Sequence, residues 1–273
     1  MALSLLESKI FLNENMQETA VYAFAGGTVC VYSARSPEKT TPNEDSLALL
    51  TCAEQTGVLV IADGLGGLRA GDLASRQAVE SLASTVMRCC TDQDSMREAI
   101  LNGVEQADEK ITAMGLGAAT TVAIVEIRER EVRPYHVGDS MTLITGQRGR
   151  IKYLTVPHSP VGYAVEAGML DANEAMYHEE RHIVSNVVGA PHMHVEIGPR
   201  VSLAVRDTLL VASDGLYDNL QVDEIAAIIR KGPLTRAAEA LASQCRSRMQ
   251  DYQPDRPHKP DDMSFILFRP VSG

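Results

Sequence analysis

Acidic residues recur in this sequence at the points where short apolar runs end. Most are followed by glycine or serine, and the five stretches are 43–46 (NEDS), 60–64 (VIADG), 137–140 (VGDS), 211–215 (VASDG) and 260–264 (PDDMS). A single acid in such a place is commonly a turn residue or a helix cap. Burying several carboxylates together is costly unless a cation compensates their charge. Five such stretches therefore predict one oxygen-lined pocket for hard divalent cations, Mg²⁺ or Mn²⁺.

Two kinds of element would position these acids. Apolar runs rich in β-branched residues, many alternating with period two as half-buried strands do, occur at about 21–33, 46–51, 57–62, 118–127, 132–145, 195–205, 207–213 and 263–268. Apolar residues recur at helical spacing in 70–90, 94–114, 222–231 and 234–250. This order favours antiparallel sheets with helices packed outside them over a regular βαβ alternation.

Composition limits the class of protein. The 273 residues suit one large domain, and a hydrophobic content of 45% is ample for a core. The formal net charge of −11 argues against nucleic acid or an anionic membrane as a partner. No apolar run approaches the length of a membrane span, and Glu7 and Lys9 make the N-terminus a poor signal peptide. We therefore expect a cytoplasmic protein.

The cysteines point the same way. Cys30, Cys52, Cys89, Cys90 and Cys245 are odd in number and show no CxxC spacing. This pattern predicts buried thiols in a reducing compartment. A redox role for the adjacent pair Cys89 and Cys90 is the alternative, but their helix-like surroundings favour core packing.

The chain divides into an extension and one domain. Residues 1–20 lack a convincing pattern and are interpreted as an N-terminal extension, so that the domain covers 21–273. Within it, residues 155–194 are polar, rich in histidine and short of strong periodicity. An insertion of that size in a compact domain is usually a lid or a binding element, so we expect a flap there.

The glycine-rich stretch 61–71 (IADGLGGLRAG) follows Asp63 directly. Glycine permits a tight path that brings backbone carbonyls close enough to bind a cation. A dinucleotide-binding loop is the rival interpretation, but Arg69 occupies the third glycine position of GxGxxG and the acid precedes the loop. The metal interpretation is therefore preferred.

The stretch 178–182 (HEERH) matches the HExxH pattern of zinc proteases. That pattern requires a helix that presents both histidines on one face, together with a third ligand downstream. The extended form of the pattern fails because Ser185 and Val188 occupy its glycine and histidine positions. A zinc metalloprotease is thus the less favoured alternative, and we expect His178 and His182 to be solvated flap residues.

Taken in order, the motifs resemble those of the type-2C metal-dependent protein phosphatases (the PPM family), most closely the bacterial branch. They span about residues 21–270 and read NEDS, ADGLGGLRAGDLAS, GAATTV, VGDS, HSPVGYAVEAGM, SNVVGA, VASDGLYDNL and DDMS. The resemblance implies an α+β fold, an α-β-β-α sandwich of two antiparallel sheets flanked by helices, with a flap. It also implies a protein serine/threonine phosphatase in which a metal-bridging hydroxide attacks phosphoserine or phosphothreonine, and which opposes a Ser/Thr kinase.

The resemblance assigns the metal ligands by position. Asp63 would bridge two Mg²⁺ or Mn²⁺ ions, the carbonyl of Gly64 would bind one of them, and Asp214 and Asp261 would complete the pair. Asp63 and Asp214 are accordingly the expected catalytic residues.

The remaining acids would act around that pair. Glu44 and Asp45 would hold metal-bound waters. In bacterial members a third ion lies near the GDS aspartate, here Asp139, and shares Asp214.

Several positions depart from the family pattern. Thr40 stands where an arginine usually holds the substrate phosphate, so Arg35 or Lys39 is the expected substitute. The absent arginine also motivates a second reading, a non-catalytic binding module on the same fold. Leu65 replaces a histidine proposed as general acid in eukaryotic members, and Asp262 replaces the usual asparagine.

Overall fold

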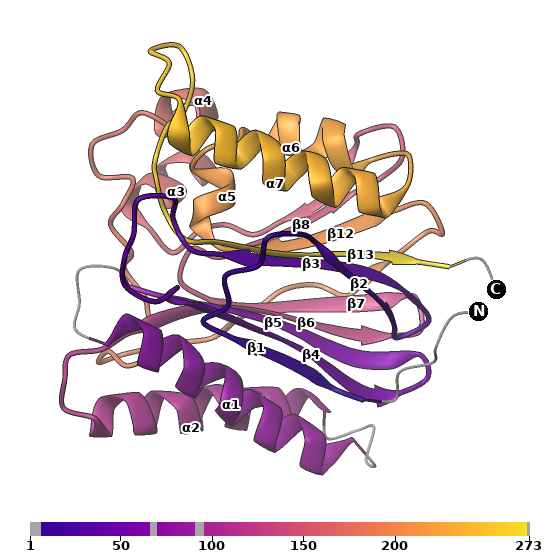
Figure 1. Cartoon of the computed structure of the whole chain (residues 1–273). Helices are drawn as coiled ribbons and strands as arrows, with labels where there is room; N and C mark the ends of the chain where they lie inside the picture. Colours follow the sequence, from indigo (N-terminus) through magenta and orange to yellow (C-terminus); the bar gives the residue numbers. More distant parts are fainter. Residues whose placement is uncertain (1–6, 66–69, 91–95, 272–273) are drawn as a thin grey trace.

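The computed structural model describes residues 7–65, 70–90 and 96–271. Its elements form four layers, with two antiparallel sheets face to face and helices on both outer faces (Figure 1). This confirms the predicted α-β-β-α sandwich.

Each sheet mixes strands from distant parts of the chain. The first sheet is ordered β1 (Lys9–Leu12), β4 (Asp45–Ala53), β5 (Thr56–Gly64), β6 (Thr120–Arg128), β7 (Glu131–Val137) and β10 (Glu196–Ile197), with β11 (Val201–Ser202) also paired to β7. The second is ordered β2 (Ala20–Phe24), β3 (Gly27–Ala34), β13 (Met263–Pro270), β12 (Thr208–Ala212), β8 (Met141–Thr145) and β9 (Ile151–Leu154).

The helices cover the two outer faces and build the flap. The first sheet is covered by α1 (Gly71–Cys89) and α2 (Met96–Ala113). The second is covered by α5 (Asp214–Tyr217), α6 (Val222–Ile229) and α7 (Leu234–Gln250). The flap contains α3 (Pro160–Glu166) and α4 (Ala172–Ala175). Within the described ranges, no helix combines the length and the apolar character that crossing a membrane requires.

Alternation along the strands separates three apolar layers. On β4 and β5, Leu47, Leu49, Leu59 and Ile61 face the second sheet, whereas the residues between them face α1 and α2. Successive side chains on a strand point to opposite faces, so residues two apart share a face. A polar residue that continues the series facing the second sheet therefore points into the layer between the two sheets.

Two of the predicted strands are each divided in the structure. The run 132–145 forms β7 and β8, which belong to different sheets, because the chain turns at Gly138 with a φ of +99°. The run 21–33 forms a hairpin, in which Ala25 and Gly26 adopt φ values of 44° and 72°. Periodicity alone did not reveal either reversal, because both turns interrupt otherwise continuous apolar runs.

Part of the N-terminal segment belongs to the first sheet. Strand β1 pairs antiparallel with β4, with Lys9 opposite Leu49. The extension predicted over 1–20 thus includes an edge strand, whereas the domain limits themselves stay a prediction.

The prediction that all the cysteines are free thiols was wrong for one pair. Cys52 and Cys90 form a disulfide across 38 positions of sequence, while Cys30, Cys89 and Cys245 are free. Helix α1 packs on β4, and this brings the end of the strand beside the residue that follows the helix. Such a tertiary proximity leaves no trace in the spacing of the cysteines.

Candidate active site

The strand ends deliver polar side chains to one end of the layer between the sheets. On β5, Asp63 continues the inward series of Leu59 and Ile61, and its cross-strand partner on β4 is Asp45. From the second sheet, Ser213 at the end of β12 donates a hydrogen bond from Oγ to Asp45 Oδ2 at 2.8 Å. The two sheets therefore contribute jointly to one polar cluster.

A cavity of about 280 Å³ lies at this cluster, and the predicted acids line it. Its lining residues are Glu44, Asp63, Gly64, Leu65, Thr121, Asp139, His182, Asp214, Lys259, Asp261 and Asp262. Asp45, which completes the predicted set, is fully buried as the cross-strand partner of Asp63. Acids separated by more than two hundred residues thus converge in a single pocket.

Burial and mutual repulsion make these carboxyl groups hard to ionise. Burial raises the pKa of Asp45 to about 8, and that of Asp139 and Asp261 to about 7, with neighbouring aspartates adding to the effect. For Asp63, burial and the charges of Asp45 and Asp214 hold the pKa well above its usual range. The ionised cluster therefore requires added positive charge.

The donors fit hard divalent cations. Oδ1 of Asp45 is buried and has no hydrogen-bond partner among the described residues. In the same part of the chain, no lysine or arginine forms an ion pair with Asp45 or Asp63, whereas Asp214 and Asp261 do have such a partner. Carboxylate and carbonyl oxygens are the ligands that Mg²⁺ and Mn²⁺ prefer. The residues present thus match the predicted metal pair.

Two glycines allow backbone segments to meet at the pocket. A Cβ on Gly64 would lie 2.1 Å from the carbonyl oxygen of Gly71, and one on Gly215 would lie 1.9 Å from that of Asp262. Both approaches are closer than any side chain permits. The glycine-rich stretch therefore serves close backbone packing here, although its residues 66–69, including Arg69, lie outside the described ranges.

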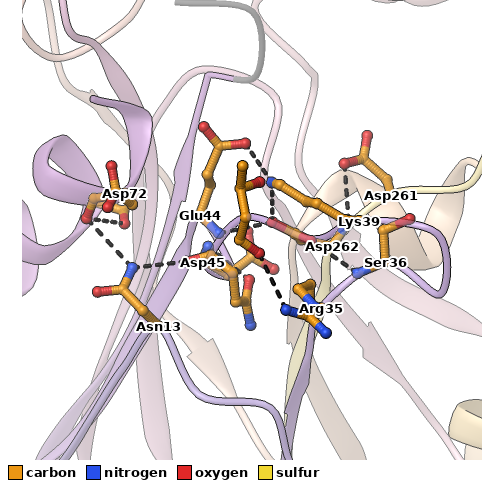
Figure 2. A network of polar contacts seen from close by, with 12 residues as sticks. Asn13, Arg35, Ser36, Lys39, Glu44, Asp45, Asp72, Asp261 and Asp262 are labelled. Atoms are coloured by element: carbon orange, nitrogen blue, oxygen red, sulfur yellow. Dashed lines mark hydrogen bonds and ion pairs between the residues drawn. The ribbon is translucent and has the colours of Figure 1, made fainter. Parts of the chain in front are cut away.

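Asp262 ties the loop before β4 to the start of β13 (Figure 2). Its Oδ1 accepts the backbone N–H of Ser36 at 2.8 Å, and its Oδ2 accepts that of Glu44 at 2.7 Å. The ammonium of Lys39 bridges the carboxylates of Asp262, at 2.6 Å, and Glu44. Arg35 instead donates to the carbonyls of Thr40 and Thr41, at 3.4 Å each. Both expected phosphate-binding cations are thus engaged with the protein, and that role stays a prediction.

The flap is joined to strands that carry the acids. The backbone N–H of Gly138, next to Asp139, donates to Nδ1 of the buried His158 at 3.1 Å. At the other end of the flap, Val188 forms an isolated bridge with Thr120, whose hydroxyl donates to the carbonyl of Asp63 at 2.7 Å. Movement of either end of the flap would therefore reach residues next to the acids.

His158 of the flap, His136 of β7 and Glu196 of β10 place ligand-type atoms within 4.8 Å of one another. The hydrogen bonds argue against a metal there. Nδ1 of His158 faces two N–H donors, from Gly138 at 3.1 Å and from Asn186 at 2.8 Å, so its proton is on Nε2, which donates to Glu196 at 3.2 Å. To bind a metal ion through Nε2, the ring would have to carry its proton on Nδ1, where these two N–H donors oppose it.

The zinc-protease interpretation was wrong. None of residues 178–182 is helical, and 179–182 lie in turns, so the two histidines do not share a helical face. His178 is exposed, as expected for a flap residue, and its Nδ1 accepts the backbone N–H of Glu180 at 3.1 Å. His182 is also exposed and reaches the lining of the acidic pocket.

Sequence reasoning missed three residues of the site, Lys259, Asp218 and Asn219. Lys259 contacts Asp214, Asp218 and Asp261, and Asn219 binds the backbone of Lys259. Two signals were available: Asp218 lies one helical turn after Asp214, and Lys259 lies two residues before Asp261. Neither signal specifies a contact until the two segments are brought together.

The fold and the acidic pocket define a metal-dependent phosphatase, and comparisons with known proteins agree. The family model described as protein phosphatase 2C matches residues 35–252. Protein phosphatase PhpP of Streptococcus pneumoniae is 31% identical over an alignment of 215 residues that covers 75% of this chain and 85% of the relative. The solved serine/threonine phosphatase of S. agalactiae superimposes with a TM-score of 0.76 at 26% identity, covering 89% of this chain and 99% of that one.

A more distant structure shows the same fold. It is the catalytic domain of the serine/threonine protein phosphatase PstP in complex with two manganese ions, with a TM-score of 0.67, 19% identity, and coverage of 89% of this chain and 98% of that one. This chain belongs to the protein phosphatase 2C family. It is a metal-dependent protein serine/threonine phosphatase, and its substrates are phosphoproteins.

Proposed function

We propose that the active form holds two Mg²⁺ or Mn²⁺ ions in the acidic pocket. Asp63 would bind both ions, the carbonyl of Gly64 one of them, and Asp214 and Asp261 would complete the set. The support is the placement of all four in the lining of one cavity. A relative of the same fold was solved with two manganese ions.

Ions bound there lower the pKa of water and neutralise charge on the phosphate oxygens. The chain's own residues hold the ligands in place. Ser213 donates to the carboxylate of Asp45, while Glu44 and Asp45 are the acids we assign to ordering water beside the ions. No serine or cysteine is among the described residues that line the pocket, which favours direct attack of water on phosphorus without a covalent intermediate.

The substrate would be a cytoplasmic phosphoprotein modified by a Ser/Thr kinase. The net charge of −11 disfavours nucleic acid or an anionic membrane as a competing partner. Arg35 and Lys39 remain our candidates for phosphate binding from the loop before β4. Lys39 is the better placed of the two, because its ammonium already lies between two residues that line the pocket.

The test is turnover of a phosphothreonine peptide with Mn²⁺, with Mg²⁺ and with EDTA. We expect turnover with either metal, none with EDTA, and near-complete loss in Asp63→Asn and Asp214→Asn. Asp255→Asn, in an exposed loop, is the matched control and should behave as wild type. Metal binding without turnover of any phosphopeptide would instead support the non-catalytic module, and full activity of Asp63→Asn would contradict the ligand assignment.

A further inference from the structure

Lys259 places its ammonium among carboxylates of the active site. Nζ lies 2.6 Å from Asp214 Oδ2, 2.7 Å from Asp218 Oδ2 and 3.1 Å from Asp261 Oδ2. The contacts with Asp214 and Asp218 are hydrogen bonds from the ammonium, and the contact with Asp261 is an ion pair. The side chain lines the pocket and retains 27% of its exposure. Lys259 is thus a cation inside the site that contacts three carboxylates.

The backbone around Lys259 is fixed by a single buried side chain. Asn219 accepts the N–H of Lys259 at 2.9 Å on Oδ1, and its Nδ2 donates to the carbonyl of Lys259 at 2.8 Å. The same Nδ2 donates to the carbonyl of Gly215 at 2.9 Å, next to Asp214. Asn219 therefore holds the backbone of Lys259 and the helix α5 that carries Asp214 in one arrangement.

The acids of the pocket fall into two groups. Asp45 and Asp63 have no cationic partner in the described part of the chain, whereas Asp214 and Asp261 meet Lys259 through Oδ2, which leaves Oδ1 of each for the two proposed ions. Asp139 belongs to the other group, because it lines the same cavity as Asp214 and Lys259, and its carbonyl accepts a hydrogen bond at 2.9 Å from the hydroxyl of Tyr217 in α5, the helix that carries Asp214. The ammonium thus serves the part of the pocket around Asp139, Asp214 and Asp218.

A further divalent ion at Asp139 and Asp214 would compete with this ammonium. Both would use the carboxylate of Asp214, and like charges so close repel strongly in a partly buried site. Arg181 of the flap lies 3.8 Å from Asp218 and adds positive charge on the same side. Lys259 and Arg181 therefore already offset part of the negative charge where a third ion would bind.

We propose that Lys259 supplies from within the chain the positive charge of a third metal ion, so that the protein binds two divalent ions and none at Asp139. This inference rests on the proposed two-metal function. Removing the ammonium should open a third site formed by Asp139, Asp214 and Asp218.

The number of Mn²⁺ ions bound per chain tests the proposal, measured by equilibrium dialysis and elemental analysis of the full chain. We expect two ions for wild type and for Lys259→Arg, which retains a positive charge. Lys259→Ser and Lys259→Met should bind three, and adding Asp139→Asn to either should restore two. Lys231→Ser, which removes an exposed lysine from the loop before α7, controls for a general change in net charge.

Anomalous scattering from wild-type crystals grown with Mn²⁺ tests the same point without relying on the variants to fold. Two Mn²⁺ ions, with Nζ of Lys259 on Asp214 and Asp218, would support the proposal. A third ion between Asp139 and Asp214 in wild type would overturn it and leave the proposed function intact. Two ions in a folded Lys259→Ser variant would overturn it equally. A wild-type chain that binds no Mn²⁺ would contradict the proposed function as well.

Discussion

Asp45 and Asp63 are direct cross-strand partners on β4 and β5, and both point into the layer between the sheets. Like charges in directly opposite positions destabilise a sheet. Asp45 is fully buried, and its Oδ2 accepts a hydrogen bond from Ser213 of the second sheet. Its Oδ1 has no hydrogen-bond partner among the described residues. Burial and this pairing therefore make the two carboxyls costly to ionise in the metal-free fold, a cost that bound cations would remove.

Asp63→Asn should separate function from stability. Removing one of the two facing charges should raise the free energy of unfolding of the EDTA-treated protein by about 1 kcal/mol. The same change should reduce phosphopeptide turnover on the order of 100-fold or more, because it removes a group that stabilises charge in the reaction. Urea unfolding in EDTA and steady-state kinetics in Mn²⁺ measure the two effects, with Asp255→Asn as the control. A destabilised metal-free variant would contradict this account of the pair.

The Lys39 bridge should be worth more than an exposed ion pair. Lys39→Met leaves the buried Asp262 without its cation and should cost about 1–3 kcal/mol of unfolding free energy. In the Lys39→Met/Asp262→Asn double variant the losses should not add, because the two residues share one interaction. Arg76→Met breaks the exposed pair with Glu80 and should cost less than about 0.5 kcal/mol. If urea unfolding shows that the two single variants lose amounts of unfolding free energy that add up to the loss of the double variant, the bridge contributes nothing.

His136 should make stability depend on pH below 6.5. Burial and the neighbouring His158 lower the pKa of His136 to about 4, so the folded protein keeps this ring neutral. The unfolded chain takes up the proton near pH 6.5. The stability that the neutral His136 contributes is therefore fully present above pH 6.5 and is lost as the pH falls towards 4. The loss is about 2 kcal/mol at pH 5.

The measurement for His136 is the difference in unfolding free energy between wild type and His136→Gln at pH 7 and at pH 5. It should shrink by about 2 kcal/mol over that interval. The same difference for Gln253→Ala, which changes an exposed residue that does not titrate, should stay constant. A wild-type advantage over His136→Gln that does not change with pH would contradict the neutral assignment.

Gly215→Ala should weaken metal binding through the backbone. A Cβ there would lie 1.9 Å from the carbonyl oxygen of Asp262, so α5 and the start of β13 must separate, and with them Asp214 and Asp261. We expect a fall in Mn²⁺ affinity on the order of 10–100-fold by calorimetric titration. Gly146→Ala, whose Cβ would meet its nearest atom at 3.5 Å, is the matched control and should titrate as wild type. Unchanged affinity in Gly215→Ala would show that the close approach does not position the acids.

The sequence revealed the acids but not Lys259, the cation that contacts Asp214 and Asp261. Asp63, Asp139 and Asp214 stand at strand ends, where periodicity and residue type coincide, so their convergence could be predicted. Lys259 and Asn219 act through contacts between segments about forty residues apart. Such contacts depend on how α5 meets the loop before β13, and no local pattern records that meeting.

The same division holds for the fold. The helix pair α1 and α2 and the long strands were predictable because each buries one periodic face. The strands β10 and β11 have two residues each, too few to show a period, and the predicted run 195–205 merged them. The disulfide between Cys52 and Cys90 likewise depends on the packing of α1 against β4.

The acids come from both halves of the sandwich, Asp45 and Asp63 from the first sheet and Asp214 and Asp261 from segments that flank β12 and β13 of the second. Ions held between them would cross-link the two halves. Loading with Mn²⁺ should therefore slow amide hydrogen exchange in β5 and β13 together, although these strands belong to different sheets and lie about two hundred residues apart in sequence.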